Sequence, residues 1–332
     1  MKTIISLLIS IVLLSACTSK SNTTERISIK FSTVYDSIES RMPGQLLINS
    51  QYAIWIDPFS AENQAHVIDL KTNKEIGKLI NIGNGPEEFL TPGFSLSTTN
   101  DLIVYDMNNN KMGLYSLDNI SNNKNPLISL TTKQTKNITK IIETDSHSFV
   151  SFHPNAQFPF KVEEGDYFGK YPFTENVKNK YNISQGNIAY NPQNEYFIYA
   201  SMDFPYIAAY HKNNFNFKLM WEKKGEMDYT IIENELILNK KRKGAAELAL
   251  TKDYIVTLQR DYQNDPTDET TVGRDFNKIP QTIFLYDYKS NLKKIVHLHT
   301  PILRIAADTK SNTVYAIVIN PDFTLVKCEL PE

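Results

Sequence analysis

The chain has 332 residues, which is enough to bury a large hydrophobic core. Its 35 lysines and arginines nearly balance its 37 aspartates and glutamates, so it lacks the broad positive field that attracts nucleic acid or anionic lipid. After the amino-terminal segment, no apolar run approaches the roughly 18 residues of a membrane-spanning helix. We therefore expect no nucleic-acid partner and no further membrane-spanning segment.

The amino terminus has the features of a cleaved signal peptide. Lys2 precedes an apolar stretch from Ile4 to Leu14, which is too short to cross a bilayer core of about 30 Å. The sequence LSAC at residues 14–17 resembles the bacterial lipobox, in which small residues directly precede a cysteine. This resemblance implies that residues 1–16 are removed and that Cys17 carries lipid. In the alternative, an ordinary secretory signal, Cys17 is incidental and the mature protein is soluble.

Residues 18–26 are polar and lack aromatic side chains, so residues 17–26 are expected to form a lipidated cysteine and a flexible tether. No aspartate follows Cys17, although many bacteria use one there to retain lipoproteins in the inner membrane. An acidic cluster of the kind that resembles a surface-export signal in Bacteroidota is also missing. We therefore expect a cell-envelope protein, anchored in the outer membrane and facing the periplasm.

The remaining residues, 27–332, carry an internal repeat. A strand, a tight polar turn and a second strand return at intervals of roughly 45 to 55 residues, followed in each case by two more strands. The six copies span residues 45–80, 94–130, 138–171, 187–222, 246–298 and 302–330. This pattern predicts an all-β fold, a six-bladed β-propeller of four-stranded antiparallel blades. The least regular part lies between residues 155 and 182.

The sixth copy ends one strand short, whereas residues 27–34 form an unpaired strand with Ile27, Ile29 and Phe31 on one face. We expect this amino-terminal strand to complete the last blade, which would close the ring and remove its open edges.

The sequence resembles the TolB-like six-bladed β-propeller lipoproteins of Bacteroidota. The resemblance rests on the lipobox and on five further segments, at residues 83–89 (GNGPEEF), 188–201, 244–262, 283–288 and 301–317. It implies the propeller fold and the lipid anchor. It implies no particular reaction.

Candidate binding residues lie where the second strand of each repeat ends. These positions are all polar: Asp57, Asp106, His153, Asp203, Asp261 and Asn320. They are expected on the face that also carries the connectors between blades, where they could form a polar ring for a polar ligand or a cation. Alternatively, such side chains bond the turn that follows them. Glu87 and Glu88 are further candidates on this face, and Phe89 is expected to anchor its connector in the core.

Three other features have competing interpretations. Residues 262–280 form the longest insertion, which could be a lid, a calcium-binding loop or a solvated loop. His297 and His299 share a strand face at a spacing that can hold zinc, but no third ligand is evident. Cys328 alternates with apolar Val326 and Leu330, which predicts a buried thiol rather than a reactive one.

The chain contains neither a GxSxG elbow nor an HExxH helix. Our leading hypothesis is a non-catalytic binding or scaffold module that recognises a glycan, a peptide or a protein and needs no cofactor. The alternative is a metal-dependent hydrolase or lyase whose site lies at the propeller channel, with Asp57, Asp106, His153 and Asp203 as its ligands. A third hypothesis is a purely structural lipoprotein within a larger envelope assembly.

Overall fold

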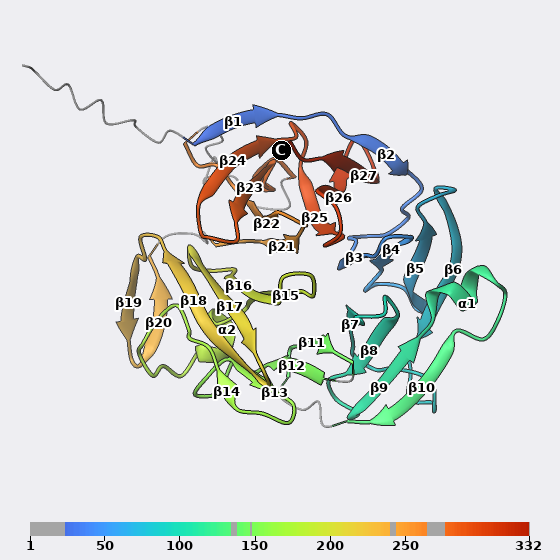
Figure 1. Cartoon of the computed structure of the whole chain (residues 1–332), viewed down its shortest axis with the longest axis horizontal. Helices are drawn as coiled ribbons and strands as arrows, with labels where there is room; N and C mark the ends of the chain where they lie inside the picture. The colour runs from blue at the N-terminus through green and yellow to red at the C-terminus, as the bar shows by residue number, and fades with distance from the viewer. Residues whose placement is uncertain (1–23, 134–137, 147, 240–243, 264–275, 332) are drawn as a thin grey trace, which may run out of the picture.

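The computed structural model describes residues 24–133, 138–146, 148–239, 244–263 and 276–331. Within these ranges the chain forms six sheets arranged as blades around a central axis (Figure 1). The predicted all-β, six-bladed propeller is confirmed. The expected signal peptide, Cys17 and the residues of the tether up to 23 lie outside the described residues, as do residues 264–275 of the long insertion.

Blades one to three each contain four antiparallel strands in chain order, with the first strand nearest the axis (Figure 1). Blade one contains β3 (Leu46–Ile48), β4 (Tyr52–Ile56), β5 (Asn63–Asp69) and β6 (Lys74–Asn81). Blade two contains β7 (Pro92–Leu96), β8 (Leu102–Asp106), β9 (Lys111–Tyr115) and β10 (Leu127–Thr132). Blade three contains β11 (Lys140–Asp145), β12 (Ser148–Phe152), β13 (Phe160–Val162) and β14 (Tyr167–Phe168).

Blades four to six follow the same plan. Blade four contains β15 (Gly186–Asn191), β16 (Tyr196–Ser201), β17 (Tyr206–Asn213) and β18 (Asn216–Lys224). Blade five contains β21 (Glu247–Leu250), β22 (Tyr254–Gln259), β23 (Thr282–Asp287) and β24 (Leu292–His297). Blade six contains β25 (Ile302–Ala307), β26 (Thr313–Ile319) and β27 (Phe323–Glu329).

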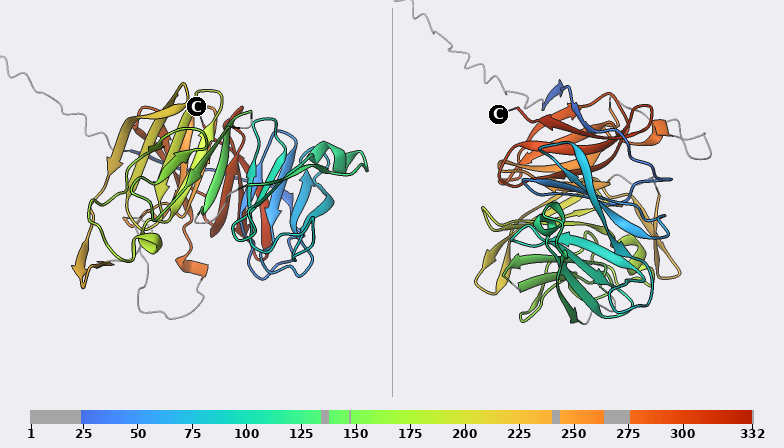
Figure 2. Two further views of the ribbon diagram at one scale, coloured as in Figure 1. Left: turned by 90° about the horizontal axis from the view of Figure 1, so that it is seen from below. Right: turned by 90° about the vertical axis from the view of Figure 1, so that its right-hand side faces the viewer.

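A hairpin of β19 (Tyr229–Ile232) and β20 (Glu235–Leu238) lies in the connector between blades four and five. The short helices are α1 (Leu117–Ser121), α2 (Lys180–Ile183) and the 3₁₀ turn η1 (Phe276–Lys278). Figure 2 shows the hairpin and η1 protruding from the same face of the ring, which we call the connector face. Across the described ranges, no helix is long and apolar enough to cross a membrane.

The second strand of a blade is apolar on both sides. All five residues of β4, YAIWI, are buried, and so are the five of β8, LIVYD. Such continuous burial arises because a neighbouring blade covers each face of the sheet, so that alternation between apolar and polar residues is lost.

The amino-terminal closure is confirmed in part. β2 (Ser32–Tyr35) pairs with β27 and completes blade six, as expected. The single strand predicted for residues 27–34 is wrong, however, because β1 (Glu25–Ser28) pairs in parallel with β24 as a fifth strand of blade five. One straight strand cannot pair with both blades, so the pairing breaks between them. β1 also begins inside the segment expected to be a tether.

Blade three is irregular, as the sequence indicated. β13 has three residues and β14 has two. Aromatic side chains compensate for the missing strand length, because the ring of Phe160 lies 5.3 Å from that of Phe168 and 5.0 Å from that of Phe197 in blade four. Tilted and edge-on contacts at these centroid distances are favourable.

Two predictions of burial are confirmed. Phe89 is fully buried in the core between blades one and two, where its backbone N–H donates to the Asn81 carbonyl. Cys328 is buried as well, and burial raises the pKa of its thiol to about 12, which keeps it protonated and unreactive.

We expect Phe89→Ala to lower the free energy of unfolding by about 3–5 kcal/mol, since it leaves a cavity beneath the connector. The matched control is Phe215→Ala, because Phe215 is 87% exposed and its loss should cost less than about 0.5 kcal/mol. Urea unfolding of both variants measures the difference. Equal losses would mean that Phe89 does not anchor the connector.

Candidate ligand-binding channel

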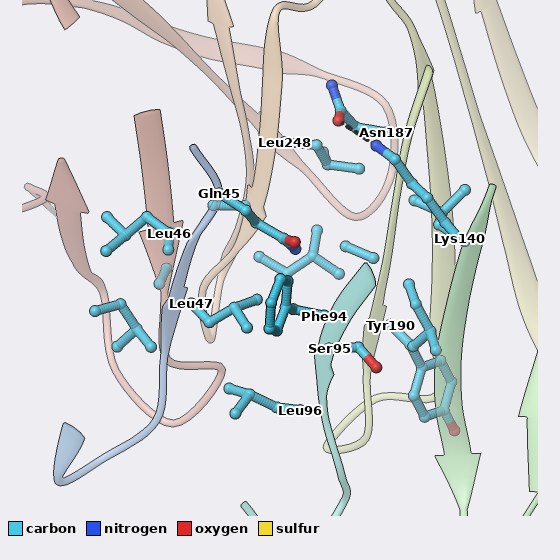
Figure 3. Close-up of a pocket in the computed structure, with 18 of the residues that line it drawn as sticks. Gln45, Leu46, Leu47, Phe94, Ser95, Leu96, Lys140, Asn187, Tyr190 and Leu248 are labelled. Carbon is cyan, nitrogen blue, oxygen red and sulfur yellow. Dashed lines mark hydrogen bonds between the residues drawn. The ribbon is translucent and has the colours of Figure 1, made fainter. Parts of the chain in front are cut away.

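A cavity of about 640 Å³ lies along the propeller axis (Figure 3). The first strands of all six blades line it. Its size falls within the range of sites that enclose small molecules. The ring therefore encloses a ligand-sized space to which every blade contributes.

Four polar side chains occupy the same place at the start of their first strands. In strand pairing, Lys140 is opposite Phe152, Asn187 opposite Ala200, Glu247 opposite Leu258 and Arg304 opposite Ile317. These partners stand at or near the ends of the second strands, so the four side chains lie at the connector face. We call this end of the channel the connector mouth, formed by Gln45, Lys140, Asn187, Glu247 and Arg304.

Lys140 and Asn187 are joined across blades three and four. The Lys140 ammonium donates to Asn187 Oδ1 over 2.7 Å, as the dashed line in Figure 3 shows. Asn187 Nδ2 donates to the carbonyls of Ala245 and Ala246 in the chain leading into blade five. These bonds fix the orientation of the amide, with its oxygen toward Lys140.

Arg304 connects blades five, six and one. Its Nε donates to the Gly44 carbonyl over 2.6 Å, and its Nη1 donates to Glu247 Oε1 over 3.1 Å. Nη1 also donates to the Leu303 carbonyl. These bonds hold the guanidinium against the wall of the channel.

The channel encloses its charged groups, which shifts their pKa values. Burial lowers the pKa of Lys140, an effect that the charge of Glu247 opposes and that of Arg304 reinforces. Burial raises the pKa of Glu247, opposed by Arg304 and Lys140. Both shifts have the direction that loss of water around a charge produces.

Apolar side chains form the wall of the channel between its two ends. Figure 3 shows Leu47, Phe94, Leu96 and Leu248 around the cavity, with Tyr190 beyond them. Such surfaces favour an apolar part of a ligand over water.

The opposite end of the channel, where the first and second strands are joined, carries carboxylates. Glu143 accepts bonds from the backbone N–H and the hydroxyl of Thr98, over 2.6 and 2.9 Å. Asp308 accepts from the backbone N–H of Lys310, and Lys310 lines this end of the channel too. The two ends of the channel thus differ in charge.

The aspartates predicted at the ends of the second strands bond neighbouring turns or the amino-terminal strand. Asp57 accepts from the Phe59 backbone N–H, and Asp106 accepts from those of Asn108 and Leu90. Asp261 accepts from Arg26 Nε over 2.9 Å.

The remaining sequence-predicted residues lie outside the channel wall as well. His153 Nε2 lies 2.8 Å from Ser151 Oγ, and burial lowers the pKa of its imidazole. Glu88 accepts from the Gly85 backbone N–H within its own connector, Glu87 is exposed, and Asp203 is buried. None of the seven candidates lines the channel cavity, and their role in ligand binding stays a prediction.

The described part of the chain contains no group of three or more His, Cys, Asp or Glu residues placed to hold a metal ion. The rings of His297 and His299 lie 5.5 Å apart, and His299 Nε2 lies 2.7 Å from Ser28 Oγ. The acidic residues of the proposed calcium loop, Asp265, Asp268, Glu269 and Asp275, lie outside the described residues.

Sequence reasoning missed the four polar residues of the channel. Their signal is a polar residue at the start of an otherwise apolar first strand, at the same place in four successive copies: KIIE, NIAY, ELAL and RIAA. An alignment of the six copies on their first strands, rather than on the ends of their second strands, would have found it.

No family model matches the sequence, and no curated protein matches it. Among solved structures, the WD40 repeats of RRP9 are similar at 9% identity and a TM-score of 0.50, over 86% of this chain and 79% of that one. The β-propeller domain of Myceliophteria thermophila Cps50 (Swd1) is similar at 9% identity and a TM-score of 0.45, over 91% and 100%. The likeness to RRP9 agrees with the propeller fold, and at this identity it concerns the fold alone.

We expect Lys140 to lose its proton at a lower pH than the ordinary lysine value of 10.5, because burial disfavours its charged form. Glu247→Gln should lower this pKa further, since the carboxylate charge favours the ammonium. Carbon-13 NMR of the lysine Cε groups measures it, with Lys140→Arg to assign the signal.

The half-buried Lys133 is the control, because its neighbours are Glu163 and Glu143 and its titration should not respond to Glu247→Gln. A Lys140 that titrates at or above 10.5 would contradict the enclosed position described above.

Proposed function

We propose that the protein is a non-catalytic binding module of the bacterial cell envelope that takes its ligand at the connector mouth of the channel. The observation that carries this proposal is the enclosed channel, in which apolar walls meet a small set of fixed polar groups. That combination is typical of ligand sites.

The polar groups are held in place without a ligand. Asn187 and Arg304 bond carbonyls of neighbouring blades, so their orientation is set by the ring itself. A site ordered in advance loses less conformational freedom on binding and gains affinity for that reason. This supports a binding role.

Catalysis is not part of the proposal. The Glu247 carboxylate is held by Arg304 over 3.1 Å, whereas a general base must be available to a substrate proton. The hydrolase hypothesis needs four residues that lie at the ends of the second strands of four different blades. None of them lines the cavity: Asp57, Asp106, His153 and Asp203.

We further propose a lipid anchor on Cys17 and a location at the outer membrane, facing the periplasm. The support for the anchor is the LSAC sequence, together with the place where the described chain begins. β1 is the outermost strand of blade five, and Arg26 ties it to Asp261. An anchor attached there would leave the central channel uncovered (Figure 1).

The anchor predicts that Cys17→Ala moves the protein from the membrane fraction to the soluble fraction and abolishes incorporation of labelled palmitate. Cys328→Ala removes the other cysteine and should change neither result. Membrane association of Cys17→Ala at the level of the unsubstituted protein would contradict the anchor.

The channel site predicts a second outcome. A panel of envelope glycans, peptides, organic acids, Ca²⁺ and Zn²⁺ should contain a compound that raises the midpoint of thermal unfolding, because a ligand of the native state stabilises it by about 2.7 kcal/mol at 100 times its Kd. Leu248→Trp should abolish this rise by filling the cavity.

The matched control is Phe215→Trp on the exposed surface, which should keep the rise. A compound that stabilises Leu248→Trp as much as the control would place the ligand site outside the channel and contradict the proposed function.

A further inference from the structure

The connector mouth carries one net positive charge. Lys140 and Arg304 are cationic and Glu247 is anionic, whereas Gln45 and Asn187 are neutral. The ion pair of Arg304 with Glu247 is direct, at 3.1 Å, so these two charges balance each other. The excess charge therefore belongs to Lys140.

Lys140 has hydrogen-bonding capacity that its protein partner does not use. An ammonium carries three N–H donors, and in the described structure one of them goes to the neutral oxygen of Asn187. Asn187 satisfies a donor but does not neutralise the charge. The Glu247 carboxylate acts on Lys140 through its charge, whereas it accepts its hydrogen bond from Arg304.

Two other half-buried lysines bond a carboxylate, whereas Lys111 and Lys180 donate to backbone carbonyls. Lys133 lies 2.6 Å from the Glu163 carboxylate, and Lys212 lies 2.9 Å from that of Asp145. Enclosed charges in proteins are normally compensated in this way. At Lys140, which lines the cavity, a direct carboxylate partner from the described chain is missing.

The rest of the channel limits the chemistry of a ligand that would neutralise the charge of Lys140. Leu47, Phe94 and Leu248 present apolar surface between the two ends of the channel, which favours an apolar body. At the far end two carboxylates, Glu143 and Asp308, outnumber the one cation, Lys310, so the formal charge there would repel a second negative charge. A ligand with one anionic group and an apolar body matches both ends.

We propose that the channel binds a small organic monocarboxylate, with its carboxylate on the Lys140 ammonium at the connector mouth and its apolar body against Leu47, Phe94 and Leu248. This inference rests on the proposed function, since it names the ligand class of the same site.

The test is calorimetric titration of the full-length protein with 3-phenylpropionate and hexanoate, each compared with its neutral amide. The carboxylates should bind at least about tenfold more tightly than the amides, because a charge-assisted hydrogen bond is lost with the charge. Lys140→Met should weaken carboxylate binding to the level of the amides. Lys133→Met makes the same change outside the channel and should leave binding within about twofold.

Lys140→Arg keeps the charge and should keep the preference for carboxylate over amide, which separates loss of the cation from damage to the fold. Equal affinity for acids and amides, carboxylate binding that survives Lys140→Met, or no binding of either acid would overturn the monocarboxylate proposal. The proposed function stands in any of these cases if another compound loses its stabilising effect in Leu248→Trp. The proposed function itself fails if Leu248→Trp leaves the stabilising effect of every such compound unchanged.

Discussion

The packing of blade against blade is the constraint on which the rest of the structure depends. Strands such as β4 and β8 are buried along their whole length, so each blade needs a neighbour on both faces. A row of blades would leave two apolar faces in water, and a closed ring leaves none. β2 joins the first segment of the chain to the last blade and completes that ring.

Ring closure also creates the channel and its polar mouth. Lys140, Asn187, Glu247 and Arg304 belong to four different blades, and they meet because each stands at the start of an innermost strand. The bond from Arg304 to the Gly44 carbonyl spans the junction between blades six and one. The charge that remains on Lys140 is thus a product of the closed architecture rather than of any local motif.

The repeat pattern predicted those features that depend on local sequence. Alternation, turns and copy number indicated six blades. Phe89 could be placed in the core as the large apolar residue of its connector, and Cys328 from its apolar neighbours. That residues 25–28 pair with β24, apart from the strand that pairs with β27, could not be predicted, because both partner strands lie late in the chain and local sequence does not choose between them. The channel site could not be predicted from residue type alone. A single lysine or asparagine before an apolar strand is common. The two residues can be identified as parts of one site only in the closed ring, where Lys140 Nζ lies 2.7 Å from Asn187 Oδ1.

The aspartates at the ends of the second strands were easy to find in the sequence, but the contacts of Asp57 and Asp106 are those of turn residues. Asp106 is fully buried and accepts from three backbone N–H groups, those of Asn108 and Asn109 in the turn that follows it among them, which is what a turn-forming side chain does. A polar residue repeated in every copy can therefore reflect a repeated turn as well as a shared ligand, and contacts across blades are needed to distinguish the two.

The most direct measurement is a crystal structure of the protein grown with 3-phenylpropionate. We expect electron density for the acid in the channel, with its carboxylate within hydrogen-bonding distance of Lys140 Nζ and its ring beside Phe94 and Leu248. An empty channel at a saturating concentration of the acid, or an acid bound elsewhere with Lys140 still bonded to Asn187 alone, would contradict it.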